Sequence, residues 1–117
     1  MGMYDDKVVL CGANSYNEKY YLNPDFEGLP DHVKEELKIM CVLYVHDVGG
    51  VVTLVFEENS ELCFEVTSED FDPTFDDIGS RLLIKKLQTE KSELLEALQM
   101  YFRVFFLNED MDLDGKE

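Results

Sequence analysis

Residues 80–107 read SRLLIKKLQTEKSELLEALQMYFRVFFL, a stretch that contains neither glycine nor proline. Its apolar side chains recur at alternating three- and four-residue steps, which is the spacing of one face of an α-helix. A continuous helix of this length would measure about 42 Å, because each residue adds about 1.5 Å along the axis. The stretch therefore predicts one long C-terminal helix. Its first stripe, which we call the seam, comprises Ile84, Leu87, Lys91, Leu94, Leu98, Tyr101 and Phe105, and Lys91 is the one position at which the apolar pattern is broken.

A second apolar stripe lies beside the seam on the same predicted helix. It consists of Leu83, Leu95, Phe102 and Phe106. An ordinary surface helix needs one apolar stripe, because only one of its faces meets the core. Two stripes predict that the helix buries apolar side chains against two different surfaces, and two interpretations of this stay open. Either residues 94–107 form a core helix that is buried on all sides, or the seam is the interface of a homodimer.

Two hairpins are predicted before this helix. Residues 7–11 form a short apolar run that ends at a glycine, which indicates a strand buried on both faces, and residues 18–22 supply its partner. Apolar and polar side chains alternate in residues 52–56 and 62–67, which are joined by a short turn and predict a second hairpin. Residues 68–79 contain one proline and four aspartates, so we expect a loop there.

The segment between the hairpins predicts a second helix over residues 30–47. Pro30 suits the first position of a helix, and Gly49-Gly50 favours a left-handed end after it. Residues 39–45, IMCVLYV, are apolar on every side. This run predicts a helix that is largely enclosed or, as an alternative that stays open, a strand.

These elements predict an α+β protein with the order ββαββα. We expect an antiparallel sheet of about four strands with two helices on one face, the C-terminal helix being the long one. The length of 117 residues fits a single domain over residues 1–107, followed by an acidic, disordered tail at residues 108–117. The three cysteines are widely spaced within apolar runs and are expected to be reduced core thiols. With no signal peptide and no apolar run of 18 residues, the prediction is a cytoplasmic protein without a membrane segment.

The charges are unevenly distributed along the chain. The formal net charge is −16, and nine carboxylates lie in residues 57–77 without a single basic residue. Nucleic acid is therefore excluded as a ligand, because phosphate binding draws on clustered lysine and arginine. Such an acidic run is typical of a solvated face. The sharper alternatives are a surface for a basic protein partner and a regulator that mimics nucleic acid.

Four segments carry a resemblance to a known family: LCGANSY at residues 10–16, KYYLNPDF at residues 19–26, IMCVL at residues 39–43 and DVGG at residues 47–50. In these the chain resembles a small uncharacterised bacterial family of the domain-of-unknown-function type, over nearly its whole length. The resemblance implies no activity, substrate or catalytic residue. In architecture and charge the chain also resembles the class I secretion chaperones, which are dimers that hold an unfolded client segment, although it lacks their N-terminal helix.

No convincing chemical site is found in the sequence. Asp110, Asp112 and Asp114 match the opening of a calcium loop, but the chain ends before the twelfth-position glutamate that such a loop needs. His32 and His46 are fourteen residues apart, too far to share a site on one helix. We therefore expect no catalytic residue, no resident metal and no cofactor.

The function expected from these observations is protein–protein contact, most simply as a homodimer with chaperone- or adaptor-like character. The competing class is an enzyme or a small-ligand-binding protein, with a pocket between the sheet and the helices. Its walls would carry Tyr16, Tyr20, Tyr21 and Tyr44. Tyrosines pack in cores as readily as they line sites, so the sequence leaves this alternative open.

Overall fold

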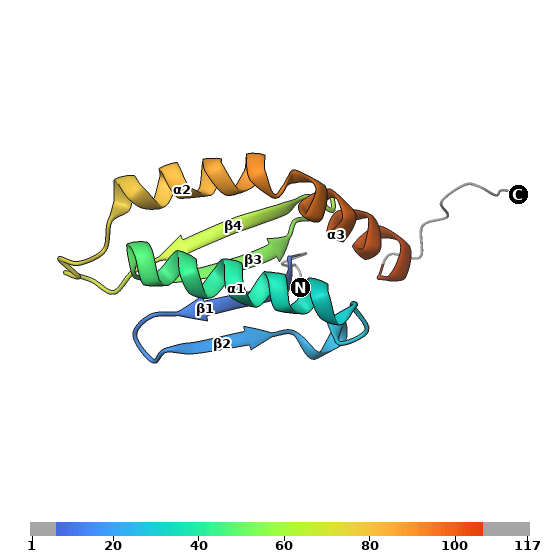
Figure 1. The fold of residues 1–117 in the computed structure, drawn as a ribbon, viewed down its shortest axis with the longest axis horizontal. Coiled ribbons are helices and arrows are strands. Elements are labelled where there is room, and N and C mark those ends of the chain that lie inside the picture. Colours follow the sequence, from blue (N-terminus) through green and yellow to red (C-terminus); the bar gives the residue numbers. More distant parts are fainter. Residues whose placement is uncertain (1–6, 107–117) are drawn as a thin grey trace, which may run out of the picture.

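The computed structural model describes residues 7–106 and confirms the α+β class (Figure 1). In chain order the elements are β1 (Val8–Asn14), β2 (Lys19–Leu22), the 3-10 turn η1 (Pro24–Phe26), α1 (Asp31–Val48), β3 (Val51–Phe56), β4 (Leu62–Thr67), α2 (Asp77–Glu90) and α3 (Ser92–Phe105). The order is therefore ββαββα with one helix more at the C-terminal end. Both predicted hairpins are confirmed.

The four strands form one antiparallel sheet in the order β2-β1-β3-β4. The pairing of β1 with β3 shifts in register between Val9 and Cys11, so that β1 accommodates one extra residue there. As a result the consecutive residues Leu10 and Cys11 are both buried, whereas Val9 is partly exposed. The uninterrupted apolar run of β1 therefore reflects this irregularity, and the expectation of a strand buried on both faces is wrong.

The helices pack on one face of the sheet and enclose the core with it (Figure 1). Helix α1 lies over the central strands, and α2 runs beside it in the opposite direction. Buried polar side chains also join the two helices, because the hydroxyl groups of Tyr44 in α1 and Ser80 in α2 share a hydrogen bond. Helix α3 covers the end of the sheet, where Phe102 stacks on Phe56 with ring centroids 4.2 Å apart.

The expected continuous C-terminal helix is two helices in the structure, joined at Lys91. Lys91 has φ −109° and ψ 21°, outside helical geometry, although its backbone still donates to Leu87 and accepts from Leu95. Its side chain reaches α1, with Nζ 3.0 Å from Glu36 Oε2. The bend has a packing reason. Helix α2 follows α1, whereas α3 turns to the aromatic end of the sheet, and one straight rod could not bury apolar side chains in both places.

The predicted helix of the middle segment is confirmed, and the strand alternative for residues 39–45 is excluded. The two glycines end it as expected, with φ +81° at Gly49 and +75° at Gly50. A Cβ atom on Gly50 would lie 2.7 Å from the Thr67 carbonyl oxygen, so this position also requires a residue without a side chain.

The expectation that this helix is largely enclosed is wrong. Ile39, Val42 and Leu43 are 49%, 41% and 56% exposed, although they lie in the most apolar segment of α1. The sheet covers one face of the helix and α2 covers part of a second, which leaves these side chains open. They delimit the two hollows described below.

Two predictions fall outside what can be described. The acidic tail with Asp110, Asp112 and Asp114, and the last residue of the predicted C-terminal helix, lie beyond Phe106. Among residues 7–106, no helix has the length and apolar character needed to cross a membrane.

Candidate functional site

Helix α1 presents three different faces to its surroundings. One face is buried against the sheet and carries Leu37, Cys41 and Val48. The flank toward α2 carries Ile39 and Leu43, and the flank toward the first hairpin carries a third set of side chains. Because the helix has apolar residues on all three faces and only one is fully covered, a hollow remains on each flank.

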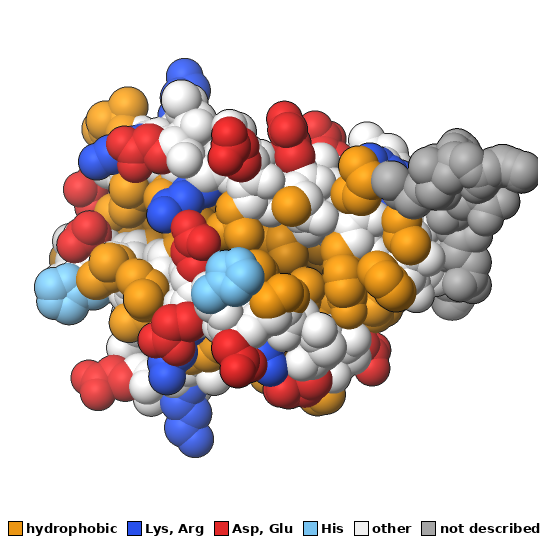
Figure 2. Space-filling model, turned by 45° about the vertical axis from the view of Figure 1, so that its right-hand side comes forward, with side chains coloured by type: hydrophobic (Ala, Val, Ile, Leu, Met, Phe, Trp, Pro, Cys, Tyr) orange, Lys and Arg blue, Asp and Glu red, His pale blue; other side chains and the backbone are white. Residues whose placement is uncertain are grey.

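The hollow between α1 and α2, which we call the helical groove, has a volume of about 480 Å³. The side chains of Met40, Tyr44, Leu83 and Leu87, all buried or half-buried, form its floor. Hydrophobic side chains gather on the face of the molecule seen in Figure 2, between charged side chains. The groove is lined by His32, Glu35, Glu36, Ile39, Met40, Leu43, Tyr44, Asp47, Leu83, Lys86, Leu87, Glu90 and Lys91.

The two rims of the helical groove differ in charge. The α1 rim is acidic, with Glu35, Glu36 and Asp47, whereas the α2 rim carries Lys86 and Lys91 besides a single glutamate. The ion pair between Lys91 and Glu36 bridges the two rims. The remaining charges are exposed to solvent, and Asp47 lies 3.5 Å from Nδ1 of the neighbouring His46.

Tyr44 anchors α1 to α2 beneath the helical groove. Its side chain is buried, and its hydroxyl hydrogen-bonds to the Ser80 hydroxyl and lies 3.3 Å from the Ser80 carbonyl oxygen. Burial raises the pKa of Tyr44, an effect that the bond to Ser80 partly offsets. The phenol is therefore a neutral structural anchor, because its proton is held more tightly than in water.

The second hollow, which we call the hairpin cleft, lies between the β1–β2 hairpin and the C-terminal half of α1. It has a volume of about 570 Å³. Its lining residues are Ala13, Asn14, Ser15, Glu18, Lys19, Tyr20, Lys38, Val42, Val45 and His46. Apolar groups form the inner part, and three groups that can carry positive charge stand at the edge with a single carboxylate. The cleft therefore differs from the rest of this acidic chain in the sign of its charge.

A buried hydroxyl and two thiols lie below the hairpin cleft. Tyr20 Oη is buried and has no hydrogen-bond partner among the described residues. The Sγ atoms of Cys11 and Cys41 are 3.8 Å apart, and both side chains are buried. Burial, followed by the neighbouring Cys11, raises the pKa of Tyr20, and the bond to Cys11, followed by burial, raises the pKa of Cys41. The Cys41 thiol is thus held in its protonated, poorly nucleophilic form.

The four tyrosines proposed as walls of one pocket do not meet. Tyr20 lines the hairpin cleft and Tyr44 the helical groove, on opposite flanks of α1. Tyr21 lies in the exposed part of β2, and the Tyr16 hydroxyl is bound to Asp72 at 2.5 Å. Tyr20 and Tyr21 both line a further hollow along β1, β2 and β3, but neither this hollow nor the two above brings all four tyrosines together.

The two histidines are likewise separated, as expected. His32 lines the helical groove and His46 the hairpin cleft. Among residues 7–106, no group of three or more His, Cys, Asp or Glu side chains is placed to hold a metal ion.

Most of the seam packs inside its own chain. Leu98 is buried, and Ile84, Leu87, Leu94 and Tyr101 are half-buried against the core. Phe105, at 67% exposed, and half-buried Lys91 complete the seam. Two of the seven residues, Leu87 and Lys91, also line the helical groove. The seam as an interface thus stays a prediction, with little free surface besides Phe105.

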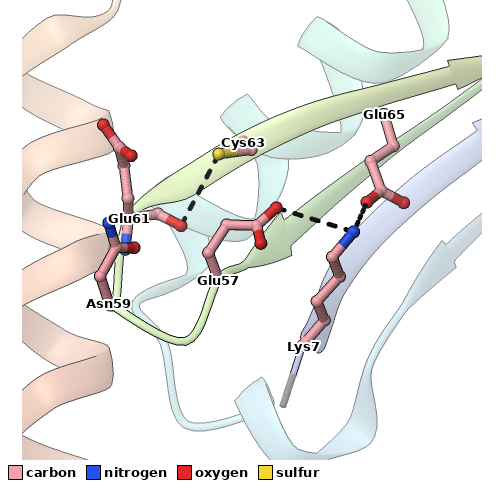
Figure 3. A network of polar contacts seen from close by, with 6 residues as sticks. All are labelled: Lys7, Glu57, Asn59, Glu61, Cys63 and Glu65. Atoms are coloured by element: carbon pink, nitrogen blue, oxygen red, sulfur yellow. Dashed lines mark hydrogen bonds and ion pairs between the residues drawn. The ribbon is translucent and has the colours of Figure 1, made fainter. Parts of the chain in front are cut away.

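The acidic segment at residues 57–77 uses many of its charges within the fold. At the second hairpin, Lys7 Nζ lies 2.6 Å from Glu65 Oε2 and 3.9 Å from Glu57 Oε2 (Figure 3). Cys63 lies in the same network, where it donates to the Glu61 carbonyl oxygen at 4.0 Å. Burial, with Glu57 and Glu61 next in order, raises the pKa of Cys63, so this thiol too is poorly reactive.

Carboxylates in the loop between β4 and α2, and in the first turn of α2, also form hydrogen bonds and ion pairs. Asp72 accepts hydrogen bonds from Thr74 N, Thr74 Oγ1 and Tyr16 Oη, at 2.9, 2.6 and 2.5 Å. Asp76 caps the first turn of α2, and Asp77 forms an ion pair with the arginine one turn further along. Five of the nine carboxylates therefore have hydrogen-bond or ion-pair partners within the fold, but none of the nine is buried, so the segment remains a solvated acidic face.

Several residues of the two hollows were not singled out from the sequence. Ile39, Val42 and Leu43 belong to the segment that is apolar on every side. Because one covered face cannot bury all of these side chains, the segment could have indicated that some of them are exposed. Lys19 and Lys38 carried no such signal. They lie nineteen positions apart in the chain and meet only because α1 packs against the hairpin.

A family model described as "Family of unknown function (DUF6145)" matches residues 7–110, from the start of β1 to beyond the end of α3. No curated protein and no solved structure matches the chain. The match accounts for the whole described fold and adds no site residue.

Proposed function

The chain belongs to DUF6145, a family of unknown function, and on that premise we propose that it acts through protein–protein contact, as a homodimer joined at the helical groove. The observation that carries the proposal is the exposed apolar surface around this groove. Ile39 and Leu43, which line the groove from α1, are 49% and 56% exposed, and the half-buried Leu83 and Leu87 line it from α2. Large apolar side chains grouped at a polar rim are typical of an interaction surface.

A second copy would stabilise the dimer by covering apolar surface that the monomer leaves exposed to water. Full burial of a large aliphatic side chain stabilises by about 1.5 to 3 kcal/mol, so a half-exposed side chain has about 1 kcal/mol still to gain. A two-fold symmetric contact uses every such residue twice. Ile39 and Leu43, buried in both copies, then supply a favourable term that competes with the cost of association, and the half-buried Leu83 and Leu87 add a smaller amount.

The charges on the rims favour one orientation of the second copy. A two-fold axis parallel to the groove places α1 of each copy over α2 of the other. The acidic rim with Glu35 and Asp47 then faces the rim with Lys86 and Lys91 twice. This match matters because two chains with a net charge of −16 each repel one another at long range.

Sedimentation velocity tests the proposal directly. We expect the wild-type chain at 1 to 100 µM to sediment with twice its mass of 13.6 kDa, and the Ile39→Asp/Leu43→Asp variant to sediment as a monomer. Both side chains are half exposed, so the far-UV circular dichroism of the variant should stay that of the folded chain. A wild-type monomer at 100 µM, or a variant that stays dimeric, would refute the proposal.

Phe71→Asp is the matched control for this variant. Phe71 is 99% exposed and lies in the loop before α2, outside the groove. Its positive φ of 61° is also one that aspartate tolerates. Loss of an exposed aromatic side chain there should leave the dimer intact, so general effects of added charge are separated from loss of the interface.

A charge-exchange experiment tests the orientation. Lys86→Glu should weaken the dimer, because it places a carboxylate opposite the acidic α1 rim of the other copy. Adding Glu35→Lys should restore it. If the double variant is as weak as Lys86→Glu alone, α1 does not face α2 across the axis and this geometry is wrong.

A further inference from the structure

We infer that the hairpin cleft binds a small organic anion with an apolar body, such as a carboxylate on an aliphatic chain or an aromatic ring. The inference concerns the flank of α1 opposite the helical groove and does not depend on dimerisation. It is carried by the position of two lysines across an apolar hollow in a strongly acidic chain.

The cleft has the size and lining of a small-molecule site. Its volume of about 570 Å³ lies within the range of about 300 to 1,000 Å³ that such pockets show. Ala13 and Val45 are buried, and Tyr20 is half-buried beside them. Val42 stands at the α1 side with 41% of its surface exposed. An apolar ligand body would cover these groups and remove apolar surface from water.

The charged groups at the edge of the cleft favour a ligand with negative charge. Lys19 comes from β2 and Lys38 from α1, so the two ammonium groups stand on different walls of the cleft. Neither lysine forms an ion pair with a described residue. By contrast, Lys34 pairs with Glu27, and Lys91 pairs with Glu36. Glu18 is the one carboxylate among the lining residues. In a chain with 26 acidic and 10 basic residues, this is a local excess of positive charge.

Neutral donors complete the polar part of the cleft. The side-chain oxygen of Asn14 accepts hydrogen bonds from the backbone of Tyr16 and Asn17, at 2.8 and 3.4 Å, which leaves its amide nitrogen as a donor. The backbone N–H of Ser15 is bound to the Gly50 carbonyl oxygen at 3.0 Å, so the turn is held in place while the Ser15 hydroxyl still lines the cleft. Donors fixed by the fold cost a ligand little further ordering.

The buried hydroxyl of Tyr20 is a further group that a bound molecule could satisfy. Tyr20 lines the cleft, and its Oη atom has no hydrogen-bond partner among the described residues. A buried hydroxyl without a partner is unfavourable, because it has lost its hydrogen bonds to water. A ligand oxygen, or a water enclosed beneath the ligand, would offset that cost.

The test uses four probes and the full chain. Octanoate and 2-naphthoate are titrated into ¹⁵N-labelled protein, and the uncharged octanamide and 2-naphthamide serve as counterparts of the same shape. We expect at least one carboxylate to shift the amide resonances of Ser15, Lys38 and Val42 in a saturable way. It should also bind at least tenfold more tightly than its amide.

Two double variants decide whether the lysines are responsible. Lys19→Gln/Lys38→Gln should raise the dissociation constant of the carboxylate about tenfold or more. Lys85→Gln/Arg103→Gln removes the same charge from residues that line neither hollow and should change it less than twofold. The ¹⁵N spectra of both variants report directly whether they are folded.

Three outcomes would overturn the inference. The first is the absence of localised shifts up to 10 mM of either carboxylate. The second is an amide that binds as tightly as its carboxylate, which would mean that the cleft takes apolar molecules regardless of charge. The third is equal weakening by the two double variants, which would mean that the anion responds only to the net charge of the protein.

Discussion

Helices α1 and α3 are both richer in apolar residues than one buried face requires, yet they differ in how much of this apolar surface is buried. In α3, Leu95, Leu98 and Phe102 are buried, whereas Met100 and Phe105 are 40% and 67% exposed. In α1, the apolar segment at residues 39–45 leaves three large side chains open. An excess of apolar residues in the sequence therefore does not show where apolar surface remains.

The difference arises from what surrounds each helix. Helix α3 follows a bend and lies against an aromatic cluster, in which Phe26 stacks with Phe56 and Phe106 at centroid distances of 5.7 and 4.6 Å. Helix α1 has the sheet beneath it and α2 on one flank, and nothing among the described residues covers its outer side (Figure 1). The outer side of α1 is thus where the structure leaves surface for another molecule.

The largest effect is expected from Phe102→Ala. The side chain is buried and stacks on Phe56, so its removal should lower the free energy of unfolding by about 3 to 5 kcal/mol. Phe105→Ala on the same helix is the control and should cost no more than about 0.5 kcal/mol. Urea unfolding followed by circular dichroism measures both. Equal losses would contradict the contrast between the buried and the exposed parts of α3.

A charge at Leu94 should separate the seam from the helical groove. Leu94 is half-buried against the core, so Leu94→Asp should destabilise the monomer by about 2 kcal/mol or more. Leu43→Asp, on the exposed flank of α1, should instead dissociate the dimer with little change in the melting temperature. If Leu94→Asp gives a stable monomer, the seam is the interface and the groove is not.

Removal of the Tyr44 hydroxyl should have an intermediate effect. Tyr44→Phe leaves the buried Ser80 hydroxyl without this partner and should cost about 1 to 2 kcal/mol in urea unfolding. Adding Ser80→Ala should recover part of that loss, because it removes the buried Ser80 hydroxyl that has lost its hydrogen-bond partner. Without any recovery, the Tyr44–Ser80 bond would not be what ties α1 to α2.

The smallest effect is expected in the loop before α2, away from both helices. The bonds from Thr74 and then from Tyr16 lower the pKa of Asp72 below its usual value of 3.8. Because the pKa is lower in the folded state, this carboxylate stabilises the fold above its unfolded pKa, and the contribution is lost as the pH falls through the folded pKa. Thr74→Val should raise the pKa of Asp72 toward its usual value in a ¹³C NMR titration, and an unchanged pKa would show that the Thr74 hydroxyl has no part in it.

Sequence reasoning placed the strands, the middle helix and its glycine end correctly, because each depends on neighbouring residues. It failed for the bend at Lys91, because one charged residue in the seam, without a glycine or proline beside it, does not by itself predict the end of a helix. It also could not find the partners of Asp72 and Glu65 within the acidic run, since these partners, Tyr16 and Lys7, lie more than fifty residues away along the chain. Of the two hollows, the sequence had singled out Leu87 and Lys91 as seam residues, Tyr20 and Tyr44 as pocket walls, and the two histidines.

The amino-acid sequence by itself determined that this is an acidic α+β chain with two hairpins, a middle helix and more apolar helical surface than one sheet can cover. Those properties follow from periodicity and composition, which are local. Tertiary structure alone decided that more of the excess is buried in α3 than in residues 39–45 of α1, and that Lys19 and Lys38 line one cleft. Exposure and proximity depend on which distant segments pack together, and apolar periodicity gives the face of a helix without giving what lies against it.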